Sequence, residues 1–190
     1  MKRIFTLSIL MISFLLTAQI KTGKDDLENE PIPPTPLTEA DQFSRRSGTL
    51  MEKQVYEIGK VKRFHVSVNK YKDLSTGEYL GAIRIGYQNF GVNSSRSAIL
   101  DSNEVDGFLK SLKLLKAQLS TKRSTYTEIK YKSRAYFEAG GFFDDKRQTW
   151  KLYMQLFTYD ALSFTLIPQD ELDGFIEIIE QSVIELKKPI

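Results

Sequence analysis

The hexapeptide EVDGFL at residues 104–109 recurs as ELDGFI at residues 171–176. Four of the six positions are identical, and each position of the second copy lies 67 residues after its counterpart. An apolar pair precedes the copies, at residues 99–100 and 166–167. Similarity within one chain at a fixed spacing is the signature of a duplicated structural unit. We therefore expect two related units, each containing this junction.

The residues around each hexapeptide predict a strand followed by a helix. Asp101 can cap a helix N-terminus and Glu104 can bond back to it, which is the arrangement of a capping box. Apolar residues then keep helical spacing to about Leu119. In the second copy Pro168 is expected to open the helix, because its missing N–H does no harm in the first turn. The apolar stripe of this second helix comprises Leu172, Phe175, Ile176, Ile179 and Val183.

Alternation of apolar and polar residues predicts strands before each helix. Phe64, Val66 and Val68 alternate with polar neighbours, so one face of their strand should be buried. Further strands are expected over residues 79–87, 96–100, 126–132, 135–143, 149–158 and 161–167. The predicted fold class is α+β, with two strand-rich units at residues 49–120 and 121–188. Each unit has three or four strands followed by one helix, and the two units pack about a pseudo-dyad.

The repeated residues can be interpreted in structural or in chemical terms. Carboxylates in a first helical turn are favoured by the exposed N–H groups and the helix dipole, typically by about 0.3–1 kcal/mol. This stabilisation explains why carboxylates occur in both copies of the hexapeptide. The alternative is that these carboxylates are catalytic or bind a metal. Glycine inside a helix costs about 1 kcal/mol of stability relative to alanine. Gly107 and Gly174 therefore predict that another part of the molecule approaches the helix backbone closely at these two positions. The repeat signature comprises Glu104, Asp106, Gly107, Phe108, Glu171, Asp173, Gly174 and Phe175.

The N-terminus has the three parts of a secretory signal peptide. A basic start at residues 1–3 is followed by an uncharged run over residues 4–16 and by small residues before a polar stretch. A membrane anchor would need about 20 apolar residues, and this run is shorter. We expect a signal peptide over residues 1–18, cleavage near Ala18, and export of the mature chain to the periplasm or the medium.

The stretch from residue 19 to residue 48 is polar and carries four of the six prolines at residues 30–36. Proline restricts the backbone and removes a hydrogen-bond donor, so this segment is predicted to be a flexible, extended linker. A proline-rich ligand for a partner is the alternative. A single globular domain is then expected over residues 49–188.

Composition excludes several chemistries. The chain of 190 residues has no cysteine and one histidine, which rules out disulfide scaffolds, thiol catalysis and zinc fingers. No nucleophile elbow, phosphate loop or dinucleotide motif is present. We therefore expect no catalytic residue, no metal and no cofactor. Removal of the signal peptide leaves 25 basic and 24 acidic groups, and this balance gives no general attraction to nucleic acid.

Aromatic and polar residues on strands are the candidate ligand contacts. Arg63, His65, Asn69 and Tyr71 are expected to share one strand face, and Tyr153 adds an aromatic group in the second unit. Aromatic and cationic groups on a sheet can bind a polysaccharide, a peptide or single-stranded nucleic acid. Tyrosine is also an ordinary strand residue, so these side chains could simply cover the sheets.

The order of strands and helices resembles the duplicated β4-α units of the whirly and PUR single-strand nucleic-acid-binding families. The resemblance covers about residues 50–187 and is one of topology, without a matching motif, so it assigns no binding residue. The chain also has the general character of small exported bacterial proteins. An export signal argues against an intracellular nucleic-acid partner.

We therefore expect an exported, non-catalytic binding or interaction module. The alternatives are an exported hydrolase built on carboxylates such as Glu57, Glu78 or Glu138, and a whirly-like binder of single-stranded nucleic acid. The two predicted helices also carry opposite charges at equivalent positions. These positions are Lys110 and Lys113 in the first helix and Glu177 and Glu180 in the second. Such edges can pair within one chain or between the two chains of a homodimer, or both edges can simply be solvated.

Overall fold

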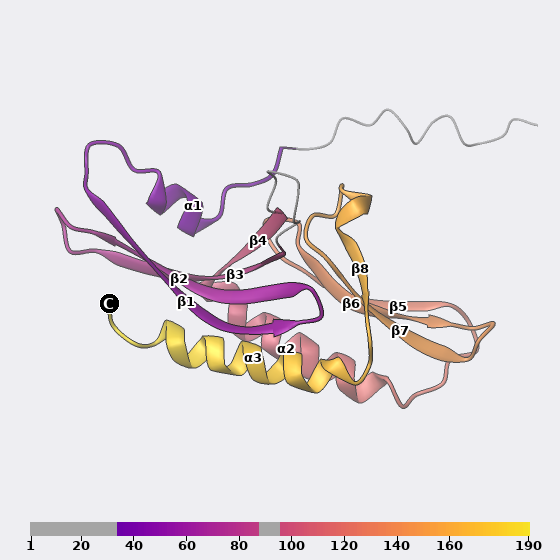
Figure 1. The fold of residues 1–190 in the computed structure, drawn as a ribbon. Helices are drawn as coiled ribbons and strands as arrows, with labels where there is room; N and C mark the ends of the chain where they lie inside the picture. Colours follow the sequence, from indigo (N-terminus) through magenta and orange to yellow (C-terminus); the bar gives the residue numbers. More distant parts are fainter. Residues whose placement is uncertain (1–33, 88–95) are drawn as a thin grey trace, which may run out of the picture. The chain divides into compact units, whose positions relative to one another are not determined.

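Two four-stranded antiparallel sheets dominate the computed structural model, which describes residues 34–87 and 96–190. Sheet A has the order β1-β2-β3-β4 and sheet B the order β5-β6-β7-β8, so sequential strands are neighbours throughout (Figure 1). Sheet A consists of β1 (Met51–Val61), β2 (Phe64–Asp73), β3 (Tyr79–Tyr87) and β4 (Arg96–Asp101). Sheet B consists of β5 (Thr127–Lys132), β6 (Glu138–Asp144), β7 (Thr149–Gln155) and β8 (Phe164–Ile167).

A helix follows each sheet directly. Helix α2 (Ser102–Gln118) comes after β4, and helix α3 (Glu171–Leu186) comes after β8. The capping box expected at Asp101 and Glu104 is formed. The α+β class with two strand-rich units, each ending in one helix, is therefore confirmed. None of the helices in the described ranges has the length and apolar character needed to cross a membrane.

Some boundaries differ from the sequence prediction. The strand expected to begin at residue 135 begins at Glu138, because Tyr136 takes a positive φ of 64° in the preceding turn. The segment at residues 161–163 is a short 3-10 turn, η1 (Ala161–Ser163), held by the Asp160 side chain, which accepts from the Leu162 N–H. Helix α3 begins at Glu171 and not at Pro168.

Part of the expected linker is folded. Residues 38–44 contain helix α1 (Glu39–Ser44), capped by the Thr38 hydroxyl, and Ala40 and Phe43 are buried against sheet A. The prediction of an extended linker is wrong for this segment, because two apolar residues three positions apart are enough where a sheet face receives them. The compact unit therefore begins at Pro34. The expected signal peptide and the linker up to residue 33 lie outside the described residues.

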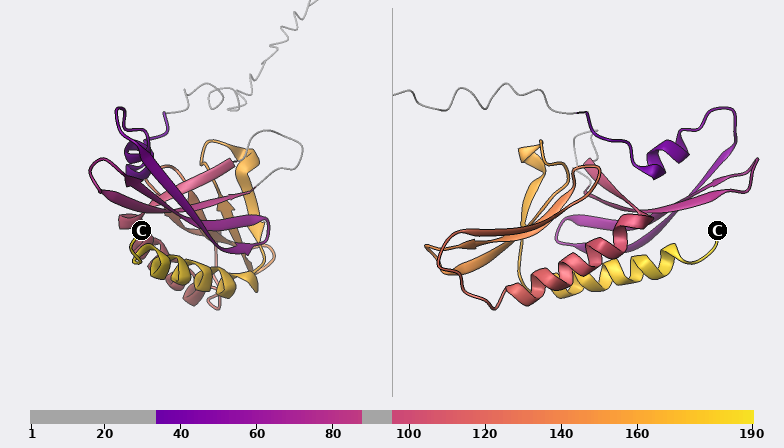
Figure 2. Two further views of the ribbon diagram at one scale, coloured as in Figure 1. Left: turned by 60° about the vertical axis from the view of Figure 1, so that its left-hand side comes forward. Right: turned by 180° about the vertical axis from the view of Figure 1, so that it is seen from behind.

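Each long helix packs on the sheet of the other unit, and α2 also packs on β3 and β4 of its own sheet. Helix α3 lies along β1 and β2 of sheet A, and α2 reaches β5 and β6 of sheet B (Figures 1 and 2). Two glycines allow the approach of α3. A Cβ atom at Gly59 would lie 2.8 Å from Ile178, and one at Gly81 would lie 2.7 Å from Leu186. The two halves are therefore interlocked.

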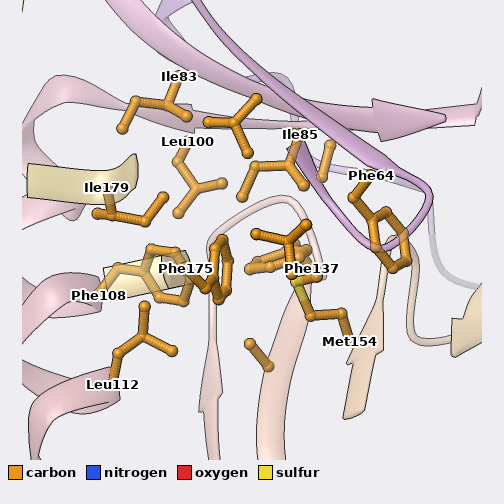
Figure 3. Close-up of a cluster of buried hydrophobic side chains, with 14 of the residues drawn as sticks. Phe64, Ile83, Ile85, Leu100, Phe108, Leu112, Phe137, Met154, Phe175 and Ile179 are labelled. Atoms are coloured by element: carbon orange, nitrogen blue, oxygen red, sulfur yellow. The ribbon is translucent and has the colours of Figure 1, made fainter. Parts of the chain in front are cut away.

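A single hydrophobic core joins the two sheets and the two long helices (Figure 3). Phe108 of α2 lies at its centre, with its ring centroid 5.5 Å from that of Phe137 and 5.9 Å from that of Phe175. Phe108 and Phe175 are equivalent residues of the two hexapeptides. A residue contacts its own counterpart only near a two-fold axis, so this contact agrees with the expected pseudo-dyad.

The charged helix edges meet across this axis. Lys113 lies 2.6 Å from Glu180, its counterpart in α3, and Lys116 lies 2.7 Å from Asp173. The end of α2 thus meets the start of α3, so the two helices run in opposite directions. Pairing within the chain is confirmed at Lys113 and Glu180. Lys110 makes no ion pair with Glu177.

The two repeated glycines have another explanation than the predicted one. A Cβ atom at Gly107 or at Gly174 would have no neighbouring atom within 4 Å, and both residues are exposed. The prediction of a close backbone approach at these positions is wrong. The four repeated carboxylates lie at or near the first turns of α2 and α3, as expected from the helix dipole.

Candidate functional site

Each sheet has an inner face on the core and an outer face on the opposite side. Helix α1 packs on one end of the outer face of sheet A, over Tyr71 and Ala82. Within the described ranges no helix packs on the outer face of sheet B, because α2 and α3 lie on its inner side (Figure 1). The strand positions of this outer face are Glu128, Lys130, Lys132, Glu138, Gly140, Phe142, Lys151, Tyr153, Gln155, Phe164 and Leu166.

Aromatic rings form a continuous row across this face, from β5 to β8. The row consists of Tyr126, Phe142, Tyr153 and Phe164. Successive ring centroids are 6.0, 6.4 and 5.0 Å apart. Tyr126 and Phe164 are 59% and 40% exposed at the two ends, whereas Tyr153 is buried between its neighbours. Aromatic side chains of this kind dominate the energetics of interfaces.

The Tyr153 and Phe164 rings stand upright on the sheet. They are stacked with an interplanar angle of 25°, and they belong to neighbouring strands. Strands are about 4.8 Å apart, so two stacked rings on neighbouring strands stand across the sheet and do not lie flat on it. These two rings cover each other's facing sides, whereas the other two pairs of the row are tilted by 30° and 43°.

The Tyr153 hydroxyl is fixed at the base of the row. It donates to the Glu128 carboxylate at 2.6 Å. Burial raises the pKa of Tyr153, and the hydrogen bond and charge of Glu128 raise it further. The phenol therefore stays protonated and acts as a donor throughout the physiological range. This bond holds Tyr153 in position and ties β7 to β5 across β6.

Charged groups at the β5 side of the row are largely paired with each other. The buried Glu138 carboxylate lies 3.4 Å from the Lys130 ammonium and 3.6 Å from the Lys132 ammonium, and it accepts from the Thr158 hydroxyl at 3.0 Å. Lys130 also lies 3.7 Å from Glu128. Charges near the aromatic row are thus balanced, and Glu138 is a structural anchor.

A depression of about 330 Å³ extends this surface at its β8 edge. It opens where β7 continues beyond the end of β8, and Lys151 and Leu166 belong both to its lining and to the outer face. Two side chains bond to its backbone walls. Lys62 donates to the Leu166 carbonyl and Gln169 to the Trp150 carbonyl, each at 2.7 Å. The exposed Leu162 and Leu166 complete an apolar edge beside Phe164.

The residues predicted as ligand contacts do not form one site. Arg63 lies in the turn before β2, stacks on Tyr87 at 4.4 Å and bonds to the Thr165 hydroxyl of sheet B. His65 is exposed, whereas Asn69 and Tyr71 are 1% and 8% exposed. Asn69 and Tyr71 are therefore not on an open strand face, because α1 and neighbouring side chains cover that end, whereas Arg63 and His65 are exposed.

Tyr153 is the predicted contact that does belong to the aromatic row. Sequence reasoning missed Phe142 and Phe164, because residues on both sides of them are also apolar or small. In the run Gly141-Phe142-Phe143, alternation cannot show which phenylalanine faces outward. Phe143 packs on Trp150 in the interior, and Phe142 points outward.

The three carboxylates considered for a hydrolase are not brought together. Glu57 lies opposite Ser67 on the outer face of sheet A, Glu78 pairs with Arg46 in the turn before β3, and Glu138 belongs to sheet B. No cluster of three His, Asp or Glu side chains that could hold a metal ion occurs in the described part of the chain.

Comparison with known proteins finds no matching protein family, no matching curated protein and no matching solved structure.

Proposed function

We propose that the protein is an exported, non-catalytic binding module that holds a partner protein on the outer face of sheet B. The observation that carries this proposal is the aromatic row, which crosses a sheet face that no described helix covers. Exposed apolar patches rimmed by polar residues are typical of interaction surfaces in proteins. Export rests on the three-part N-terminus of the sequence.

The orientation of the rings favours a protein as the partner. Sugars and single-stranded bases stack on open ring faces, and the Tyr153 and Phe164 rings cover each other's facing sides. The aromatic row, with the exposed Leu162 and Leu166 beside it, instead resembles the inner face of a sheet that packs on another sheet. The balanced charges around Glu138 give no excess of positive potential for a polyanion.

The charged rim would give the contact its orientation. Lys151 lies directly beside Phe142 on the neighbouring strand and also lines the depression at the β8 edge. An acidic group on the partner can reach Lys151 while an apolar side chain enters the depression beside Leu166. Interfaces commonly combine such an apolar centre with a polar rim.

The test is a selection of peptides against the full chain from a random peptide library displayed on phage. Peptides that alternate apolar and polar residues should be enriched. Their affinity should fall about 30-fold for Phe164→Ser, because aromatic anchors at interfaces typically contribute about 2 kcal/mol or more. Serine is chosen because Ser97 occupies the equivalent position of sheet A.

Leu74→Ser is the matched control. Leu74 is 48% exposed in the turn after β2 of sheet A, so its replacement should leave peptide binding unchanged. Thermal melting should show that both variants fold. A selection that yields no peptide dependent on Phe164 would overturn the proposal. So would a glycan array in which oligosaccharides, and not peptides, depend on Phe164.

A further inference from the structure

Strand β5 lies at one edge of sheet B, and no described strand pairs with its outer side. A Cβ atom placed on Gly140 of β6 would have the Ile129 carbonyl oxygen as its nearest neighbour, so this carbonyl points towards β6. The direction of the backbone groups alternates along a strand. The N–H and C=O groups of Glu128 and Lys130 therefore point to the open edge. Such a row of unpaired groups is a template for pairing with another strand.

Two other sheet edges carry protection that β5 lacks. Strand β1 has a bulge between Glu57 and Gly59, and the Leu166 carbonyl of β8 accepts from the Lys62 ammonium at 2.7 Å. Bulges and covered backbone groups keep edges from pairing with other chains. Strand β5 instead pairs with β6 in regular register over all six residues, and it contains no proline. Its edge is therefore suited to a regular partner strand.

The side chains of β5 are complementary to those of a second, antiparallel copy of β5. In a register centred on Ile129, Glu128 of each copy lies opposite Lys130 of the other, where opposite charges attract. In the same register Tyr126 lies opposite Lys132, and an ammonium can lie against a tyrosine ring. A register centred on Lys130 or on Glu128 would instead place two like charges at the axis. Lysines on an edge usually discourage pairing, but the register at Ile129 gives each of them an attractive neighbour.

Glu128 keeps one carboxylate oxygen for such a pair. Its Oε1 atom accepts from the Tyr153 hydroxyl at 2.6 Å and lies 3.7 Å from Lys130 of the same chain. Its Oε2 atom has no hydrogen bond or ion pair with any residue that the structure describes. An ammonium from a second copy can therefore reach Oε2 without displacing the bond that holds Tyr153.

The inner side of β5 is also less well covered than the equivalent side of sheet A. Ile178 of α3 packs on Gly59 of β1, where a Cβ atom would lie 2.8 Å from it. The counterpart of Ile178, 67 residues earlier in α2, is the small Ser111. A groove of about 110 Å³ lies there between α2 and β5, and its lining includes Ser111, Ile129 and the 57% exposed Leu114. An apolar side chain from a second copy can cover this groove at Ile129.

We propose that two copies of the chain form a symmetric dimer in which their β5 strands pair antiparallel about Ile129. Glu128 of each copy exchanges backbone hydrogen bonds with Lys130 of the other, and the two Ile129 side chains meet beside the grooves on the inner side. Each contact occurs twice, as two-fold symmetry requires, and the two copies of sheet B become one continuous sheet. This dimer does not involve the charged edges of α2 and α3, and it does not rest on the function proposed for the aromatic row.

A single introduced cysteine tests the register, because the chain has no cysteine of its own. At the axis the two Ile129 residues form a pair without backbone hydrogen bonds, whose Cα atoms lie about 4.5 Å apart, within the span of a disulfide. Ile129→Cys should therefore give a covalent dimer on oxidation by air, seen in a non-reducing gel. Thr127→Cys is the matched control on the same strand face. It would lie opposite Tyr131 and roughly 13 Å from its own equivalent, so it should not form this cross-link.

Sedimentation equilibrium of the full chain tests the charges. The wild-type protein should have the mass of two chains at micromolar concentration. Lys130→Glu should raise the dissociation constant of the dimer about 100-fold, because it places two pairs of like charges across the interface. Glu128→Lys should do the same, whereas an equimolar mixture of the two variants should dimerise as tightly as the wild type, because opposite charges face each other again. Lys60→Glu, at an exposed position of β1, is the control and should change nothing.

Thermal melting checks that each variant is folded, because Lys130 also lies 3.4 Å from Glu138. A wild-type chain that stays monomeric up to millimolar concentration would overturn the proposal. So would a dimer that Lys130→Glu leaves intact, or equal cross-linking through positions 127 and 129. If the charge variants do not fold, the two cysteine variants decide the question alone.

Discussion

The outer faces of the two sheets show how one scaffold supports two surface chemistries. The pairing registers of the strands allow sheet A to be aligned with sheet B residue by residue. In this alignment Phe64 of sheet A corresponds to Phe137 of sheet B. Both of these phenylalanines are fully buried in the common core. The outward positions have diverged. Three outward residues of sheet B belong to the aromatic row, namely Phe142, Tyr153 and Phe164. Their counterparts in sheet A are, in the same order, Asn69, Arg84 and Ser97.

The difference between inward and outward positions shows which residues the fold constrains. Inward residues of both units fill one core around Phe108 and Phe175, so most of them are apolar, although Lys70 and Gly141 also face inward. Outward residues contact only their neighbours on the same face, and their chemistry is free to follow a ligand. The comparison also extends to the strand–helix junctions. Asp101 precedes α2 as a buried acid, whereas Pro168 occupies the equivalent position before α3.

The largest expected effect comes from this junction. Asp101→Ala should lower the free energy of unfolding by about 3 kcal/mol, because it leaves Arg134 and the α1 N–H groups without their partner. The measurement is urea unfolding of the full chain. Asp170→Ala, at the N-cap of α3, is the control, since that side chain makes no capping bond and should matter little.

The same substitution has a local readout. Arg45 and Arg46 are already exposed, and release of α1 should loosen the backbone around them, so trypsin should cleave there faster in Asp101→Ala than in the wild-type chain. Equal unfolding energies for the Asp101 and Asp170 variants would show that the two junctions are alike in spite of their different contacts.

A smaller effect of the opposite sign is expected at the repeated glycines. Gly107→Ala and Gly174→Ala should each stabilise the protein by about 0.5–1 kcal/mol, because both positions are helical, exposed and open. Thermal melting provides the measurement. Gly140→Ala is the contrasting control, since its Cβ atom would lie 2.4 Å from the Ile129 carbonyl oxygen and should destabilise the protein. Destabilisation by the two helical alanines would mean that the repeat preserves glycine for contacts with another molecule.

The smallest effect is expected at the ion pair on the pseudo-dyad. Lys113→Glu should cost about 0–1 kcal/mol, because both side chains are roughly half exposed. Adding Glu180→Lys should recover the loss, which a double-mutant cycle by urea unfolding can measure. Additive effects without recovery would show that the two side chains do not interact in solution.

Local rules were enough to derive the architecture from the sequence. The hexapeptide repeat, the capping box at Asp101 and the alternation around Val66 depend only on neighbouring residues, and each is found in the structure. Helix α1 was missed because its two buried residues gain their contacts from a sheet that is distant in sequence. The boundary at Glu138 was missed because it depends on the backbone turn at Tyr136.

The candidate surfaces were harder to predict than the fold. Alternation correctly separates Phe64 from His65, yet it cannot tell an exposed outer face from one that a helix covers, as at Tyr71. It also fails at Phe142, whose neighbours are glycine and phenylalanine, and at Phe164, which faces outward while the polar Thr165 beside it is buried. The pairing of Arg84 with Ser67 likewise cannot be predicted from alternation, because strand register is a tertiary property.

The ion pair between Lys113 and Glu180 has a consequence for the history of the chain. These residues occupy equivalent positions at a two-fold axis, so an assembly of two identical halves would have placed like charges there. Lysine facing lysine, or glutamate facing glutamate, would have been repulsive. The attraction between Lys113 and Glu180 requires two halves that differ in sequence. Gene fusion allows two copies of one ancestor to differ in this way while they stay together in one molecule.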